Sequence, residues 1–251
     1  MYDLHSILIQ LKKEDTPLHG VMVRCVRCFY QWLDPTLLEG SALFELWEQE
    51  LELIYGDLRQ RLSPNAKTDT GFLGDRFGFD TPPELPRLLQ SIQTFYSVLI
   101  KFIAWNTLRG ATPEPPLTEL LSGRAFVNRG IRNFCGDDWY IWPLDIWDPA
   151  LETQCEELRA CLKSFDTCPE GSTLSPDSLS RIYETVVSPA LRHALGEYYT
   201  PGWLAERTLQ NAVSASGRQA GDLRFLDPAC GSGVFLIQAL RMIPADTPQD
   251  P

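Results

Sequence analysis

The sequence predicts a mainly helical N-terminal domain over residues 1–175, followed over residues 176–251 by the start of an α/β domain. Two observations lead to this prediction. Apolar side chains recur at helical spacing through most of the first part. Near the end of the chain, a short apolar strand, a loop of small residues and a helix follow one another. A strand, loop and helix in that order form the repeating unit of α/β domains.

Apolar periodicity locates the helices of the first part, and loop-forming residues separate them. The expected helices cover residues 3–13, 18–33, 41–61, 84–108, 149–165 and 177–194. The helix at 84–108 is apolar on nearly every face, so we expect it at the centre of the core. Asp148 and Pro149 suit the N-cap and first position of the helix that follows them. Residues 63–83 and 110–116 are rich in glycine and proline and are expected to be linkers.

The second part contains two helices and one strand by the same reasoning. Pro189 can start a short helical turn that Gly196 ends. Thr200 is expected to cap the next helix, residues 202–214, with Pro201 at its first position. The strand is expected at Leu223–Leu226, and the last helix at 234–242. The tail, residues 244–251, is rich in proline and aspartate and is expected to be disordered.

Composition limits the classes of function. The formal net charge is −11, which argues against a DNA-binding surface over the whole chain, because phosphate contacts need basic residues. Two arginine clusters could make local contacts with DNA or could be solvated surface: Arg124, Arg129 and Arg132, and Arg207, Arg218 and Arg224.

The start of the chain lacks a signal peptide, and Lys101 interrupts the longest apolar run, so no membrane span is expected. Seven cysteines without disulfide spacing favour a reducing cytoplasm.

Two clusters in the first part have competing interpretations. Cys25 and Cys28 have the spacing of half a zinc site, but no second pair lies at a suitable distance. Two buried thiols on a helix are the favoured interpretation, and no metal site is predicted. The tryptophan-rich segment 125–148 either stacks on bases or seals the helical domain. The second interpretation is favoured.

The loop that follows the predicted strand, in the sequence FLDPACGSGVF at 225–235, has the chemistry of a ligand site. Gly231 and Gly233 allow positive φ and close approach of a ligand to the backbone. Asp227 can accept hydrogen bonds from an ammonium group. Leu236 occupies the place of the third glycine of a dinucleotide loop, and no Gly-Lys-Ser/Thr triplet occurs. Both phosphate-binding loops are therefore disfavoured, although the helix N-terminus could still bind a carboxylate. A tight turn without a ligand is the alternative.

The loop and the upstream Gly-Glu-Tyr-Tyr-Thr-Pro cluster at 196–201 together resemble the N6-adenine DNA methyltransferases. The resemblance implies a Rossmann-like α/β domain that uses S-adenosylmethionine (SAM). It implies that the cofactor contacts Tyr199, Thr200, Pro201, Asp227, Ala229, Gly231 and Gly233. Glu197 either pairs with Arg192 or binds the cofactor. Residues 125–148 are also similar to the helical N-terminal domains of large restriction–modification and phage-defence methyltransferases.

The resemblance also implies a catalytic Asn/Asp-Pro-Pro-Tyr/Phe loop, which the sequence lacks. Its two Pro-Pro pairs, Pro82-Pro83 and Pro115-Pro116, do not continue to an aromatic residue. No catalytic residue is therefore assigned, and the chain is expected to be a fragment, a split-gene subunit or a truncated product that is inactive alone. Its expected partners are DNA, through the complete enzyme, and a C-terminal methyltransferase fragment or other defence-system subunits. A nuclease is not expected, because no Glu-x-Lys triplet occurs. The alternative function is a non-catalytic helical scaffold with a remnant SAM loop.

Overall fold

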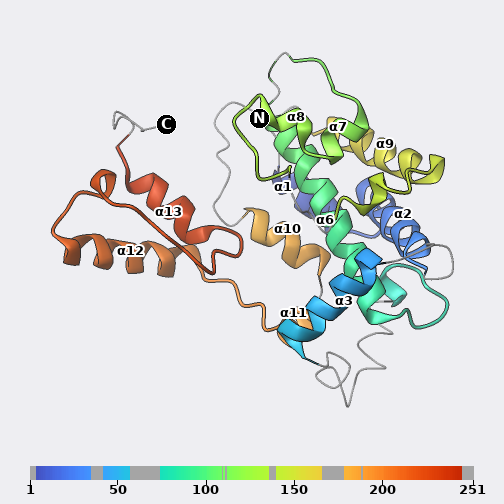
Figure 1. Cartoon of the computed structure of the whole chain (residues 1–251), viewed down its shortest axis with the longest axis horizontal. Helices are drawn as coiled ribbons and strands as arrows, with labels where there is room; N and C mark the ends of the chain where they lie inside the picture. Colours follow the sequence, from blue (N-terminus) through green and yellow to red (C-terminus); the bar gives the residue numbers. More distant parts are fainter. Residues whose placement is uncertain are drawn as a thin grey trace.

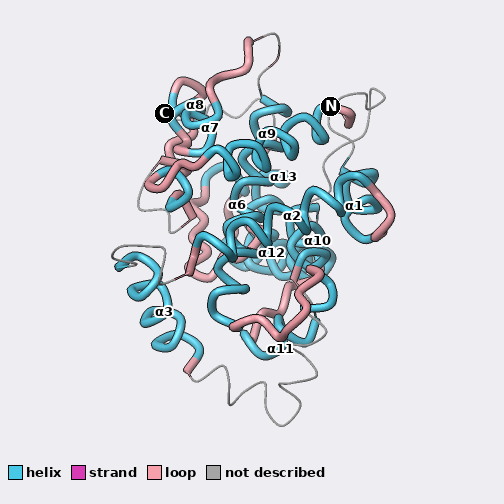
Figure 2. Tube along the Cα trace, turned by 90° about the vertical axis from the view of Figure 1, so that its right-hand side faces the viewer, coloured by secondary structure: helices cyan, strands magenta, loops and turns pink. Residues whose placement is uncertain are grey.

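The computed structural model describes residues 4–34, 42–56, 74–108, 110, 112–135, 140–165, 178–187 and 189–244. Within these ranges the chain consists of helices and loops (Figure 2). The helices are α1 Leu4–Lys12, α2 Pro17–Trp32, α3 Ala42–Tyr55, α6 Leu85–Leu108, α7 Leu117–Leu121, α8 Arg124–Val127, η1 Trp142–Leu144, α9 Pro149–Lys163, α10 Ser178–Val186, α11 Pro189–Leu195, α12 Gly202–Ser216, η2 Ala220–Asp222 and α13 Val234–Met242. Five of the helices expected in the first part therefore correspond to α1, α2, α3, α6 and α9.

Helix α6 lies at the centre of the helical body, as its composition predicts (Figure 1). It packs against α2, α7, α9 and α10, and its apolar side chains, such as Phe95 and Leu99, are fully buried. Lys101, the charge inside this apolar helix, is also buried. Its ammonium group donates to the Leu121 carbonyl at 2.8 Å, at the end of α7. A buried cation is therefore satisfied by a helix C-terminus, where the dipole favours positive charge.

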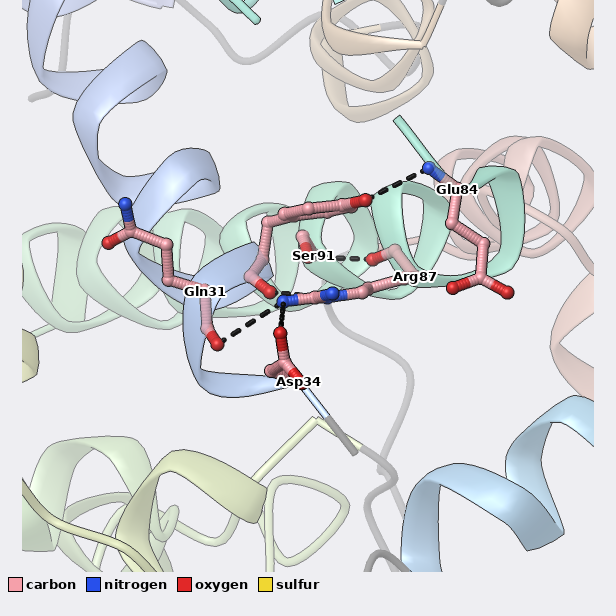
Figure 3. A network of polar contacts seen from close by, with 6 residues as sticks. Gln31, Asp34, Glu84, Arg87 and Ser91 are labelled. Carbon is pink, nitrogen blue, oxygen red and sulfur yellow. Dashed lines mark hydrogen bonds and ion pairs between the residues drawn. The ribbon is translucent and has the colours of Figure 1, made fainter. Parts of the chain in front are cut away.

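A polar cluster joins the end of α2 to the start of α6 (Figure 3). The Arg87 guanidinium lies over the Tyr30 ring at 4.1 Å and donates from Nε to the Tyr30 carbonyl at 2.6 Å. A second nitrogen lies 3.3 Å from the Asp34 carboxylate. The Tyr30 hydroxyl in turn accepts from the Glu84 backbone N–H at 2.9 Å. These bonds satisfy carbonyls that the end of α2 leaves unpaired.

The tryptophan-rich segment seals the helical body, so the favoured interpretation is confirmed for its described residues. Trp142 is buried, its ring meets Phe29 edge-on at 5.8 Å, and its indole N–H bonds Thr94. Trp147 packs partly buried against the same core. Residues 136–139 lie outside the described ranges.

The thiols of Cys25 and Cys28 are buried where α2 packs against α9, which confirms the interpretation as core cysteines. Burial raises the pKa of the Cys28 thiol to about 11 and that of Cys155, on α9, to about 12. Such thiols stay protonated and unreactive at neutral pH. No group of three or more metal-ligating side chains occurs among the described residues.

Two short helices, α7 and α8, were not predicted from the sequence, and Gly123 connects them. Gly123 has φ +79°, and a Cβ there would lie 2.0 Å from the Phe134 carbonyl oxygen. The missing side chain lets the following loop lie directly against the turn.

The helix expected at 177–194 is divided into α10 and α11. Helix α10 ends at Val186 and α11 begins at Pro189, which lacks a backbone N–H and suits the first position of a helix. Gly196, with φ +73°, follows the end of α11 as predicted. The predicted cap of α12 is wrong. Pro201 itself is the N-cap, without a side-chain hydrogen bond, so Thr200 lies one residue too early to cap the helix.

The α/β start predicted for the second part is also wrong. Helices α12 and α13 pack against each other with η2 beside them, and in Figure 1 they form a lobe to one side of the helical body. Residues 223–227 are not a strand, because no segment of the described chain forms a backbone ladder with them. A strand exists only when a neighbour satisfies its N–H and C=O groups.

Several expectations fall outside the described ranges: the end of the helix at 41–61, most of the linker 63–83, Cys168 and the tail after residue 244. Among the described helices, none has the length and apolarity needed to cross a membrane.

Candidate cofactor-binding site

At the start of the loop before α13, the Asp227 carboxylate has a hydrogen-bond partner at one of its two oxygens only, among the described residues. Asp227 Oδ1 accepts from the Ala229 backbone N–H at 3.2 Å, a short turn that fixes the side chain over its own backbone. Its other oxygen, Oδ2, is buried and has no hydrogen-bond partner among the described residues. A buried carboxylate oxygen without a partner is costly. A cationic ligand would remove that cost.

The two glycines of the loop have the conformations predicted for them. Gly231 has φ +50° and Gly233 has φ +77°, so both occupy the left-handed region that other residues adopt only with strain. A Cβ added at either position would meet nothing within 4 Å. Gly233 directly precedes α13, so the free N–H groups of that helix begin at the loop. The loop therefore has open space beside a helix N-terminus.

A small cavity of about 210 Å³ lies between α12, α13 and the segment before the loop. Its lining residues are Leu209, Phe225, Leu226, Asp227, Phe235, Leu236 and Ala239. Sequence reasoning did not assign Leu209 or Phe235. Helical spacing places Phe235 and Ala239 on one face of α13, which is the pattern that predicts them as neighbours.

The Tyr-Thr-Pro segment contacts the helical body. The ring of Tyr199 contacts the ring of Tyr183 on α10 edge to face, with 6.0 Å between the ring centroids. Tyr183 contacts Tyr96 of α6 in the same way, with 5.2 Å between the centroids. Tyr199 is half-buried in this stack, whereas the neighbouring Tyr198 is 73% exposed. Thr200 is half-buried, and Pro201 is exposed.

Of the two partners considered from the sequence for Glu197, Arg192 and the cofactor, Arg192 does not form an ion pair with its carboxylate in the described structure. Its Oε1 accepts from the Tyr183 hydroxyl at 3.0 Å, and Arg192 pairs instead with Glu184 at 3.4 Å. Glu197 Oε2 is buried without a hydrogen-bond partner in the described chain. Burial raises the pKa of the Glu197 carboxyl above its ordinary value of 4.5, against the opposing effects of the Tyr183 hydrogen bond and the Arg192 charge.

The two halves of the predicted site come from different parts of the fold. In Figure 1 the starts of α12 and α13 lie toward the same end of the lobe, the end from which the chain leads back to α11. Within the described residues, however, no hydrogen bond, ring contact or shared cavity joins Tyr199 or Thr200 to the loop at 227–233.

The arginine clusters have structural roles where the structure gives them partners. Arg129 donates to the Leu108 carbonyl at 2.5 Å and lies over the Trp105 ring at 5.9 Å. Arg218 donates to the Asp222 carbonyl at 2.5 Å. These contacts favour the interpretation as ordinary surface arginines for Arg129 and Arg218.

Comparison with known proteins finds a similarity that covers only part of the chain. Residues 174–250 match the sequence model of the family N-6 DNA Methylase. The Type II methyltransferase M.VspI of Vibrio sp. (strain 343) is 35% identical over 71 residues, which cover 28% of this chain and 16% of that protein. No solved structure matches the chain significantly. The C-terminal part of the chain, residues 174–250, is therefore similar to the N-6 DNA methylases, and the chain spans only a small part of the length of the relative it matches.

Proposed function

We propose that residues 196–242 form the SAM-binding segment of a DNA adenine-N6 methyltransferase of a restriction–modification or phage-defence system. The observation that carries the proposal is the loop before α13, which lies within the matched region and combines a half-used buried carboxylate with open space at two positive-φ glycines. This combination is unfavourable for a turn without a ligand.

The residues of the loop fit the methionine end of SAM. Asp227 Oδ2 would accept from the ammonium group, and the N–H groups at the start of α13 would bind the carboxylate. The open space at Gly231 and Gly233 would admit the ligand against the backbone, beside Ala229. Tyr199, Thr200 and Pro201 would contact the same end of the cofactor. Bound SAM supplies a methyl group activated by the sulfonium charge.

The proposed substrate is an adenine base in DNA, which enzymes of this chemistry extrude from the duplex. The groups that hold the adenine amino nitrogen have no match in this sequence, so they would come from other parts of the assembly, such as a C-terminal methyltransferase segment. We place the protein in the cytoplasm, where its DNA substrate lies and where unpaired cysteines are stable.

The test is a titration of the 251-residue chain with SAM carrying a ¹³C-labelled methyl group, followed by NMR. We expect weak binding, with a Kd near ~1 mM, because each missing hydrogen bond to a charged group weakens binding by about 1.5–3 kcal/mol. Asp227→Ala should abolish binding. Asp222→Ala, which removes an exposed carboxylate from η2 in the same lobe, should leave it unchanged. Equal affinity in the wild type and Asp227→Ala would refute the assignment of the pocket.

A second candidate function is a non-catalytic scaffold that retains a remnant SAM loop. Large apolar side chains on the lobe favour it: Trp203 is 69%, Leu226 88% and Leu240 62% exposed. Such side chains are typical of surfaces that contact another protein. The same titration separates the two, because a remnant loop would bind no SAM even at ten times the expected Kd.

A further inference from the structure

Three tyrosine rings from separate elements contact one another in a row that ends at Tyr199, in the proposed cofactor segment. Tyr96 belongs to α6, Tyr183 to α10, and Tyr199 to the segment after α11. Their rings meet edge to face, at 5.2 Å for the first pair and 6.0 Å for the second. Tyr183 therefore connects the central helix α6 to Tyr199.

Glu197 adds a polar link to the same row of rings, two residues before Tyr199. Its backbone N–H donates to the Arg192 carbonyl at 2.8 Å, which closes the end of α11, and its side chain accepts from the Tyr183 hydroxyl at 3.0 Å. Gly196, at φ +73° with nothing within 4 Å of a Cβ, leaves this turn free of steric restraint. The Tyr183–Glu197 bond is a polar contact that joins this segment to the helical body.

Burying the Glu197 carboxylate to make this contact lowers the stability of the folded protein. One of its oxygens is buried without a hydrogen-bond partner, and so is Arg192 Nε beside it. Buried polar groups without full partners cost stability, and an apolar side chain would pack the same site more favourably. A group that lowers stability while fixing one geometry fits a role in orientation.

We propose that Glu197 and Tyr183 are positioning residues that hold Tyr199 in the orientation used for cofactor binding. The inference rests on the proposed function, because Tyr199 is taken as a SAM contact. Tyr183 acts through its hydroxyl, which fixes Glu197, and through its ring, which supports the ring of Tyr199. Neither residue touches the cofactor.

The experiment compares Tyr183→Phe, Glu197→Ala and Glu197→Gln with the wild type, using the whole chain. Tyrosine labelled with ¹³C in the ring reports the environment of Tyr199, which is assigned with Tyr199→Phe, and ¹³C-methyl SAM reports affinity. Tyr30→Phe is the matched control, since its hydroxyl accepts a hydrogen bond at the distant junction of α2 and α6.

We expect Tyr183→Phe and Glu197→Ala to shift the Tyr199 resonance without SAM present. Each should weaken SAM binding about two- to tenfold, the effect of one lost hydrogen bond. Glu197→Gln should restore most of the affinity, because its amide oxygen can accept the same bond. Tyr30→Phe should change neither quantity.

An unmoved Tyr199 resonance, or unchanged affinity, in folded Tyr183→Phe would overturn the inference while leaving the proposed function intact. Unchanged affinity in Tyr199→Ala, or no binding by the wild type, would instead overturn the proposed function and this inference with it. Circular dichroism melts identify any variant that unfolds. If Glu197→Ala does so, Tyr183→Phe, which only removes a hydroxyl, decides the question.

Discussion

The indole N–H of Trp142 donates to Thr94 Oγ1 at 2.9 Å, and both side chains are buried in the helical body. Thr94 lies on the central helix α6, whereas Trp142 belongs to the segment that covers it. The bond lets a large aromatic ring be buried without leaving its donor unpaired.

Thr94→Val should therefore destabilise the protein by about 1–3 kcal/mol, because the indole N–H stays buried and loses its acceptor. Urea unfolding followed by tryptophan fluorescence measures the change. Thr107→Val is the control on the same helix, since Thr107 is exposed and its hydroxyl donates to the Ile103 carbonyl one turn back, and it should cost less than about 0.5 kcal/mol. Equal effects of the two substitutions would contradict the assigned role of the bond.

Two glycines with similar backbone angles should respond differently to alanine. Gly217, at the end of α12, has φ +68° and open space at the Cβ position, so Gly217→Ala should cost about 1 kcal/mol of backbone strain. Gly123→Ala adds a direct clash with the Phe134 carbonyl and should cost about 3 kcal/mol or more. Thermal melts of the two variants provide the comparison, and a Gly123→Ala protein as stable as Gly217→Ala would contradict the close approach.

Hydrogen exchange should separate α6 from the segment before the candidate loop. The amides of residues 224–227 have no backbone acceptor within the described chain, whereas those of α6 are bonded within a buried helix. We expect the amides of residues 224–227 to exchange within seconds to minutes. The amides of α6 should exchange more slowly than any others in the chain. Slow exchange at residues 224–226 in a monomer would mean that these amides have found a partner strand.

Glu197 should make the stability depend on pH. Its folded-state pKa is raised by burial, so the folded protein binds this proton more tightly than the unfolded chain does. The stabilising contribution is complete below the ordinary value of 4.5 and is lost as pH rises through the higher folded pKa. Glu197→Gln removes this titration, so its stability relative to the wild type should increase as pH rises above about 4.5. A stability difference that stays constant across this range would show that the carboxyl is not perturbed.

Methyl transfer provides a test of the catalytic assignment. We expect residues 1–251 alone to transfer no methyl group to plasmid DNA, because neither Pro-Pro pair continues to an aromatic side chain that could stack on an extruded adenine. Tritiated SAM and a filter assay measure the transfer. Counts above a control without protein would show that the adenine-binding groups have been overlooked in this sequence.

Local features were predictable from the sequence because neighbouring residues alone decide them. The Asp148 side chain accepts from the Ala150 N–H at 2.7 Å, and Pro149 begins α9, as the capping pattern predicts. The left-handed conformations of Gly231 and Gly233, and the helix that follows them, also agree with the pattern of the loop. The apolar composition of α6 correctly predicted its place in the core.

Contacts between distant residues were decided only by the tertiary structure. The sequence offered Arg192 as an ion-pair partner of Glu197, but the packing of α10 beside the turn after α11 placed the Tyr183 hydroxyl against its carboxylate instead. Likewise, residues 223–226 have the composition of a strand but do not form one. A strand needs backbone hydrogen bonds to a second segment, and the residues of the strand itself do not specify that segment. Composition thus determined the helices and the ligand-like loop, because propensity and capping act over a few residues. Partners of buried polar groups and of extended backbone depend on which segments the fold brings together.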